Sequence, residues 1–446
     1  MALNATVVIN NQAGLDANSI NLLNLDAQAA TATWSSVLAG TANINIEIDI
    51  LPTAINGSGR GGGTAGYYVY TGDSGAIHNF QTPTAYKLST GLTPSSVTGP
   101  DIKIDLQLSY VQNTLWLDPT PYDNGADIPT NRTDAVSVLV HEMGHAIAFN
   151  GFRDWSTGAL TSNGQSTFDQ HVQVTAGGPV FHGLNVDAVY GKDPALTTGN
   201  LYHFGNASPG TGSDLISDLM NGVVYYNGHR YSPGSVDLAT IADIGVGTIQ
   251  NDFLTAPSTG QILDAGLGQD TVFVNSGHSL NTVTVQNSVA TIVNSDAGNF
   301  TLQNAERIAF NDGVVAIDTE GNAGQVYRLY QASFARTPDL LGLSHNVKIV
   351  DQGLSLHDMA AAFTVSSEFQ GRYGVNASDQ TFISALYHNV LGREPDPTGN
   401  AGWLQLLGSQ QYDRANVLIG FSESIEDKAL VASAIQHGIA LDYGVA

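Results

Sequence analysis

The chain has 446 residues, more than one hydrophobic core usually holds, so we expect two or three domains. Its net charge of -25, from 40 acidic and 15 basic residues, argues against nucleic acid or an anionic membrane surface as a partner. No cysteine is present, so the fold does not rest on disulfides. Residues 1–6 lack the features of a cleaved export signal, and no apolar run of about 18 residues follows, so we expect no membrane insertion.

The first predicted elements are one helix and two strands. Residues 19–39 carry apolar side chains at helical spacing, and Ser19 is the expected N-cap. Residues 44–50 and 102–108 alternate between apolar and polar side chains, a pattern that predicts half-buried strands. The glycine cluster at 57–66 predicts a flexible loop, and it lacks the Lys-Ser/Thr ending of a phosphate-binding loop.

The next predicted helix carries the residues with the clearest chemistry. An apolar stretch, residues 135–149, follows the N-cap candidate Asp134. Within it His141 and His145 are four residues apart, so both side chains lie on one helix face and can bind one metal ion, with Glu142 beside it. This is the arrangement of zinc peptidases, in which the ion activates a water molecule and the glutamate acts as general acid/base.

A third metal ligand must come from elsewhere in the chain. Between Glu47 and Glu306 the sequence contains no glutamate except Glu142, so the third ligand is expected to be histidine or aspartate. The short motif His-Glu-x-x-His-x-x-Gly-x-x-His would require glycine at 148 and histidine at 151, where this chain has Ala148 and Gly151. The residues alone leave three histidines open: His171, His182 and His203.

Residues 130–246 resemble the leishmanolysin-like metzincins. The resemblance is carried by Leu201-Tyr202-His203-Phe204, by Ser217-Asp218-Leu219-Met220-Asn221, and by the helix-like segment 235–245. It implies a catalytic domain with a twisted sheet and a zinc helix, His203 as the third zinc ligand, and Met220 in the Met-turn beneath the metal. The chain departs from the family in Ala148, in a shorter insertion and in its lack of cysteine, which excludes a cysteine-switch latency.

The same resemblance implies how a substrate binds. Metzincins hold the peptide along an edge strand above the zinc helix, which points to residues 102–108 or 110–117, although a central strand is the alternative for either. Related enzymes also place a tyrosine after the Met-turn to stabilise an oxyanion. Tyr225, Tyr226 and Tyr231 follow Met220 here, but each is more simply explained by packing, so none enters the predicted site.

The C-terminal half differs from the N-terminal half in its sequence patterns. Residues 251–320 consist of short β-type runs, and 263–273 resemble one copy of the nonapeptide that binds calcium in type I secreted proteins; a metal-free turn is the alternative. From residue 321 onward the pattern is helical and duplicated, because Arg336-Thr337-Pro338-Asp339 recurs 57 residues later as Arg393-Glu394-Pro395-Asp396. We expect Arg336 and Arg393 to be structural. The duplicated unit resembles a helical module of undefined function found in type I secreted and surface-layer proteins, which implies export without a cleaved signal.

The sequence therefore predicts an α+β protein with three domains: a zinc peptidase domain at 1–250, a β-rich segment at 251–320 and an all-helical module at 321–446. The predicted function is that of a secreted zinc endopeptidase acting on proteins or peptides. Its zinc ligands are His141, His145 and His203, Glu142 is its catalytic residue, and calcium is a second candidate cofactor. The alternatives are a surface-layer or adhesive protein with an inert zincin domain, attached through the C-terminal module, and a hydrolase of non-peptide amides.

Overall fold

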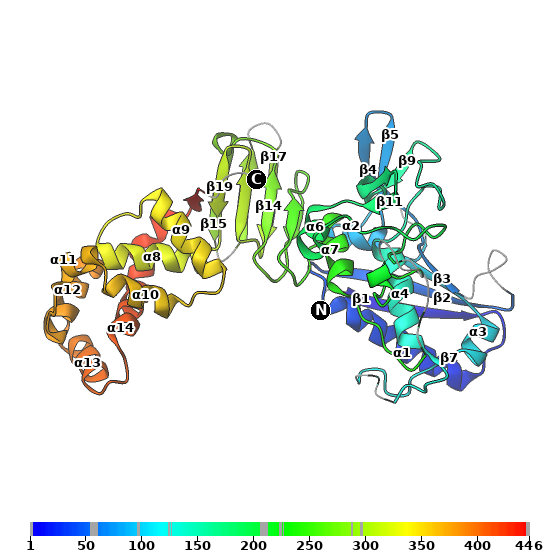
Figure 1. Cartoon of the computed structure of the whole chain (residues 1–446), viewed down its shortest axis with the longest axis horizontal. Helices are drawn as coiled ribbons and strands as arrows, with labels where there is room; N and C mark the ends of the chain where they lie inside the picture. The colour runs from blue at the N-terminus through cyan, green and yellow to red at the C-terminus, as the bar shows by residue number, and fades with distance from the viewer. Residues whose placement is uncertain are drawn as a thin grey trace. The chain divides into compact units, whose positions relative to one another are not determined.

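The computed structural model of the chain, drawn in Figure 1, has mixed α+β architecture with a helical C-terminal region. It describes residues 3–53, 61–95, 99–123, 125, 127–205, 213–222, 225, 227–286, 289–294 and 298–442. The chain divides into two compact units, Met1–Asp270 and Thr271–Ala446. The second unit thus contains most of the predicted β-rich segment together with the helical module. In the described parts of the chain, every helix is too short or too polar to cross a membrane.

The first unit is built on a four-stranded sheet with the strand order β1-β2-β6-β3. Its strands are β1 (Leu3–Asn11), β2 (Ala42–Leu51), β6 (Ile102–Gln107) and β3 (Gly61–Ala65). β1, β2 and β6 are parallel, and β3 runs antiparallel to β6. The two strands predicted from alternation are confirmed as β2 and β6, whose buried isoleucines supply much of the core.

One edge of this sheet is formed by β3, a strand that the sequence did not predict. The prediction of a loop is wrong for residues 61–65, and residues 57–60 lie outside the described residues. The prediction of an edge at 102–108 is wrong because β6 lies between β2 and β3. Residues 110–117 are not an edge of this sheet either, since they belong to helix α3 (Leu108–Asn113) and the short strand β7 (Leu115–Trp116).

Two helices pack against each other beside the sheet, α1 (Ala17–Ser35) and α4 (Ala135–Ile147). The buried indole of Trp34 joins them, with Nε1 donating to the Val140 carbonyl at 2.8 Å. The N-cap of α1 is Asp16, and the prediction of Ser19 is wrong. Asp16 accepts the backbone N–H groups of Asn18 and Ser19, and a carboxylate is a stronger acceptor than a hydroxyl at the positive end of a helix.

The N-terminus of α4 is held by a buried charge network. The predicted N-cap Asp134 is confirmed, because its side chain accepts the Ser137 N–H at 3.0 Å. Arg230 donates to both carboxylate oxygens of Asp134 at 2.9 Å and also to Asp118 at 2.5 Å. Asp26 of α1 completes the network by accepting the backbone N–H of Asp118. One guanidinium thus serves a cluster of three buried carboxylates.

We expect Asp26 to make the stability of the first unit depend on pH. Burial raises the pKa of Asp26 to about 8, and its neighbours Asp118 and Asp134 add to the effect. Because the pKa of Asp26 is higher in the folded than in the unfolded chain, protonation of Asp26 stabilises the folded chain. This contribution to the free energy of unfolding is full below about pH 4 and is lost as the pH rises towards about 8. Asp26→Asn keeps the acceptor for Asp118 and removes that loss.

Urea unfolding of the parent and of Asp26→Asn at pH 5 and pH 8 tests this expectation. From pH 5 to pH 8, the free energy of unfolding of the variant should rise relative to that of the parent by roughly 2–4 kcal/mol. A constant difference between the two proteins at both pH values would contradict a protonated Asp26 in the folded chain.

Smaller elements surround this core. A second sheet consists of β4 (Val69–Ser74), β5 (Ile77–Gln81) and β9 (Gly164–Ser166). A two-stranded ribbon is formed by β10 (Val172–Thr175) and β11 (Gly178–Phe181), and β7 pairs with β8 (Thr133–Asp134). Further α-helices among the described residues of the unit are α2 (Pro83–Thr90), α5 (Thr167–His171), α6 (Leu184–Tyr190) and α7 (Ser235–Asp243). The strands near its end are β12 (Phe253–Thr255) and β13 (Ile262–Asp264).

The calcium-repeat resemblance falls on two stacked turns. Thr248 forms a parallel bridge with Gly266, and two further contacts join residues 18 apart: Gln269 N–H to Asn251 Oδ1 at 2.9 Å and Asp252 N–H to Asp270 Oδ1 at 2.8 Å. The carboxylate of Asp252 is occupied by the backbone N–H and hydroxyl of Thr248. The segment is therefore one turn of a short stack rather than an isolated turn, and calcium binding there stays a prediction.

The second unit begins with strands. One sheet contains β14 (Thr271–Val274), β18 (Arg307–Phe310), β19 (Gly313–Ala316) and β20 (Ile439–Leu441), and a meander contains β15 (Asn281–Gln286), β16 (Val289–Asn294) and β17 (Gly298–Gln303). β20 follows the helices in sequence and pairs with β19. Along the chain, the helical region thus lies between two strands that are neighbours in one sheet.

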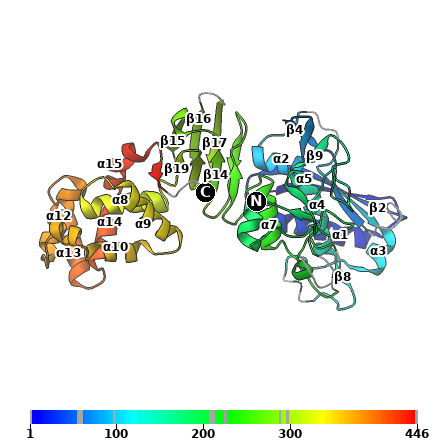
Figure 2. The same cartoon turned by 45° about the horizontal axis from the view of Figure 1, so that its top comes forward.

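The predicted duplication is confirmed as two sets of four helices, coloured from yellow to red in Figure 2. The first set is α8 (Asn322–Phe334), α9 (Leu340–Asp351), α10 (Leu356–Thr364) and α11 (Ser367–Tyr373). The second set is α12 (Asp379–Leu391), α13 (Pro397–Gly408), α14 (Arg414–Ser422) and α15 (Ile425–Ile435). The structural role predicted for the two arginines is also confirmed. Arg336 Nε donates to Glu368 at 2.8 Å and Arg393 Nε to Glu426 at 2.7 Å, at equivalent places in the two copies.

Candidate metal centre and cleft

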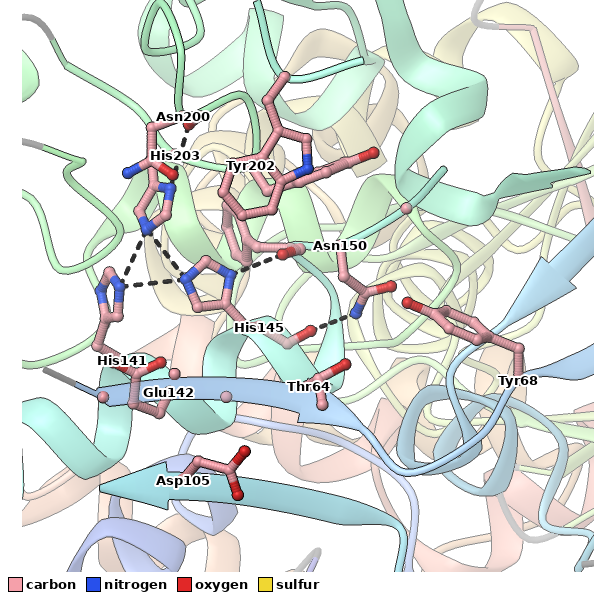
Figure 3. Close-up of a pocket in the computed structure, with 16 residues that line it drawn as sticks. Thr64, Tyr68, Asp105, His141, Glu142, His145, Asn150, Asn200, Tyr202 and His203 are labelled. Atoms are coloured by element: carbon pink, nitrogen blue, oxygen red, sulfur yellow. Dashed lines mark hydrogen bonds between the residues drawn. The ribbon is translucent and has the colours of Figure 1, made fainter. Parts of the chain in front are cut away.

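Three histidines that are distant in sequence converge on one point in the first unit. His141 and His145 project from one face of α4, and His203 comes from a turn more than fifty residues later. Figure 3 shows their rings turned towards one another. The Nε2 atom of His141 lies 3.2 Å from those of His145 and His203, and the latter two are 3.0 Å apart. Of the predicted rivals, His203 is the histidine that joins the pair on the helix.

The outer nitrogen of each ring fixes its tautomer. Nδ1 of His141 faces the Leu219 carbonyl at 2.8 Å, and Nδ1 of His145 faces that of Phe149 at 2.7 Å. Nδ1 of His203 likewise faces the Asn200 carbonyl at 3.2 Å. A carbonyl only accepts, so each Nδ1 carries the proton, and each neutral ring keeps a lone pair on Nε2.

Burial keeps the three rings neutral. It lowers the pKa of His141 to about 3 and that of His145 to about 4, and it also lowers the pKa of His203. Three unprotonated Nε2 atoms cannot hydrogen-bond to one another, and a shared cation would satisfy all three. Three imidazole ligands of a tetrahedral zinc ion are separated by about 3.3 Å, close to the spacing observed here, so this donor set fits such an ion. The group is one of three such clusters among the described residues.

The segment that carries His203 is tied to Met220. The Phe204 N–H donates to the Met220 carbonyl at 2.8 Å, next to His203. The Met220 side chain is fully buried and packs on Gly144 of α4 so closely that a Cβ at Gly144 would lie 2.6 Å from its sulfur. A side chain at position 144 would therefore displace the thioether of Met220. This contact brings the residue after the third histidine and the helix of the first two into one packed unit.

The insertion between α4 and His203 is organised by Asp169, a residue that the sequence analysis did not single out. Its buried carboxylate accepts the N–H groups of Phe152 at 2.7 Å and Ser166 at 2.9 Å, and the hydroxyl of Tyr202 at 3.1 Å. A Cβ at Gly151 would lie 2.3 Å from this carboxylate. Asp169 thus joins the end of α4 to the residue before His203, and the Ser166-x-x-Asp169 spacing of a capping box was the sequence signal that could have found it.

Glu142 faces the cleft and is oriented by the edge strand. Its carboxyl accepts the N–H of Gly63, and burial raises its pKa to about 7 against the opposing effect of that hydrogen bond. β3 approaches α4 so closely that a Cβ at Gly63 would lie 2.0 Å from the Glu142 carbonyl oxygen. Glycine is therefore necessary at this position, which explains a glycine-rich strand that sequence patterns describe as a loop.

The histidines and Glu142 open into a cavity of about 660 Å³. Its walls include the glycines of β3, Asp105 of β6 and an aromatic group contributed by Tyr68, Trp155 and Tyr202. Trp155 is 57% exposed and lies edge-on to Tyr202 with 6.3 Å between ring centroids. None of these residues was predicted to line the site, because single aromatic or acidic residues in polar segments carry no periodic signal.

Of the remaining candidates, His171 and His182 lie outside the triad, whereas Tyr225 packs beside it. His171 Nδ1 faces the His182 carbonyl, and the exposed His182 forms a group with the half-buried Asp187 and Asp193. Tyr225 packs edge-on against His141 at 5.3 Å, and its hydroxyl donates to the Leu219 carbonyl. Tyr231 is buried against Tyr225, and Tyr226 lies outside the described residues.

Comparison with known proteins bears on the second unit. Residues 360–431 match a family described as a domain of unknown function (DUF4214). The match begins within α10 and ends within α15, so it takes in the end of the first copy and most of the second copy of the duplicated helices. Neither the curated proteins nor the solved structures gave a match. What the comparisons establish is a similarity to this family within the helical region of the second unit.

Proposed function

We propose that the first unit is a zinc-dependent endopeptidase of the metzincin type, with His141, His145 and His203 as the metal ligands. One observation carries the proposal: all three Nδ1 atoms donate to backbone carbonyls, which leaves three lone pairs on Nε2 atoms 3.0–3.2 Å apart. Buried polar atoms without partners are costly, and a metal ion is the partner that suits three neutral imidazoles.

Glu142 is the proposed general acid/base. Zinc, when bound, lowers the pKa of a coordinated water molecule and polarises a peptide carbonyl. The Glu142 carboxylate takes a proton from the attacking water and delivers it to the nitrogen of the leaving amine. Its Gly63 hydrogen bond holds the carboxyl in position, and a pKa near 7 suits a group that both accepts and donates a proton at neutral pH.

The free edge of β3 is the proposed binding strand for an extended peptide. Gly66 N–H donates to the Asp101 carbonyl, so even-numbered residues of the strand bond to β6 and odd-numbered ones face outwards. Gly63 gives its outward N–H to Glu142, which leaves the backbone groups of Gly61 and Ala65 for a substrate strand. Because such an edge binds the backbone of the substrate and not particular side chains, it accommodates internal segments of many sequences, as an endopeptidase requires.

The second unit is the proposed export and surface-association region. Support comes from its duplicated helices and from the match of residues 360–431 to the family of undefined function. In this proposal the chain works outside the cell on protein or peptide substrates.

Metal removal tests the proposed function. The purified chain is expected to hold about one zinc ion, to lose cleavage of an unfolded, fluorescently labelled protein after chelation, and to regain it with stoichiometric zinc. Its melting temperature should also fall on chelation and recover with zinc, because the ion binds the folded state. Full activity in chain shown to be metal-free would contradict the proposal.

A further inference from the structure

Asp105 is a carboxylate in the cleft that the proposed chemistry does not use. It lies on β6 and lines the same cavity as Glu142. Its Oδ1 atom is buried and has no hydrogen-bond partner within the described parts of the chain. Because a buried, unpaired carboxylate oxygen is unfavourable, a donor from outside the chain is the natural partner.

The path from the free edge of β3 to Asp105 is open. Asp105 is paired with Gly62, and directly opposed residues of antiparallel strands point to the same face of the sheet. A Cβ at Gly62 would meet no atom within 4 Å, unlike one at Gly63. Figure 3 shows Asp105 on the strand next to the one that carries Thr64. The missing side chain at Gly62 therefore leaves room for a substrate side chain to pass over β3.

The surroundings of Asp105 favour a cation. Lys103 lies on the same strand, but its ammonium is paired with Asp49 at 3.2 Å and Glu47 at 3.7 Å. These three carboxylates and one ammonium leave the face locally negative. Burial raises the pKa of Asp105, which Lys103 opposes and the carboxylates of Asp49 and Glu47 reinforce. A positively charged group beside Asp105 would relieve both the burial and the repulsion.

We propose that Asp105 is a specificity-determining residue that binds a lysine or arginine side chain of a peptide paired with the edge of β3; this inference rests on the proposed peptidase function. Strands lie about 4.8 Å apart, so a substrate residue opposite Gly62 has its Cα about 10 Å from that of Asp105. A lysine side chain extends roughly 6 Å from its Cα and an aspartate side chain about 2.5 Å. The lysine ammonium can therefore come within hydrogen-bonding distance of the Asp105 carboxylate. The bond is charge-assisted on both sides.

Cleavage of matched peptides tests the inference. A set of fluorogenic peptides carries one lysine at successive positions, each with a norleucine counterpart that keeps the stem and removes the charge. For one position, kcat/KM of the parent should favour lysine by about tenfold, the effect of one hydrogen bond to a charged group. Asp105→Asn should remove the difference between the two peptides. Glu394→Gln, which neutralises a carboxylate that is 83% exposed in the second unit, should retain it.

A second variant separates binding from misfolding. Gly62→Thr keeps Asp105 and fills the open space above β3, so it should also reduce the preference for lysine. The affinity of Glu142→Gln for the same uncut peptides, measured by fluorescence anisotropy, should show the preference without cleavage. A parent that cuts peptides, or a Glu142→Gln protein that binds them, with no preference for lysine at any position overturns the role of Asp105. Loss of zinc-dependent cleavage alone would count against the proposed function instead.

Discussion

Replacing Glu142 with glutamine is expected to remove most of the peptidase turnover while zinc stays bound. The amide has the shape of the carboxylate, and its oxygen can still accept the Gly63 N–H. It cannot take a proton from water and pass it on, and loss of general acid/base catalysis typically lowers kcat by about a hundred- to ten-thousandfold. None of the three histidine rings is altered, so zinc content and melting temperature should match those of the parent.

The matched control is Glu47→Gln, which makes the same chemical change at a half-buried position of β2, outside the cavity. It should cleave an unfolded protein substrate at the parental rate. If kcat of Glu142→Gln equals that of the parent while both proteins hold zinc, Glu142 is not the general acid/base. Another group must then transfer the proton.

Replacing His203 with alanine is expected to abolish high-affinity zinc binding. The change leaves only His141 and His145, because His203 supplies the third converging Nε2 atom. Loss of a partner behind a metal ligand already weakens binding by about 10–100-fold, and loss of the ligand itself should exceed that. Zinc competition against a chromophoric chelator measures the change, and the shift of melting temperature on adding zinc should disappear with it.

His182→Ala is the control for this experiment, because His182 is a rival from the same insertion that lies outside the triad. It should bind zinc as the parent does. A variant at 182 that loses zinc while the variant at 203 retains it would overturn the assignment of the third ligand.

Local patterns predicted the elements whose conformation is decided by nearby residues. Alternating isoleucines sufficed for β2 and β6, and an aspartate before an apolar run sufficed for the start of α4. The duplicated helices were predictable because one motif recurs at a nearly constant distance. In the site, the i, i+4 spacing placed His141 and His145 together without any knowledge of the tertiary fold.

The rest depended on contacts between distant segments. Nothing in the spacing distinguishes His203 from His171 or His182, and only its resemblance to a family pattern favoured it. β3 has no alternating pattern, because glycine is imposed by its close approach to α4 at Gly63. Asp105 gave no signal either, since its importance comes from the strand paired with it.

The pairing of β20 with β19 has a consequence for how the helical module can be exchanged or lost. Val314 lies opposite Leu441 and Ala316 opposite Ile439, so the last strand completes a sheet that begins before the first helix. The module is nested within the second unit, and both of its ends are anchored side by side. A chain that stops short of residue 439 would lose the strand pairing of β19 together with the buried side chains of Ile439 and Leu441, so trimming at the very end should loosen the core on which the module rests.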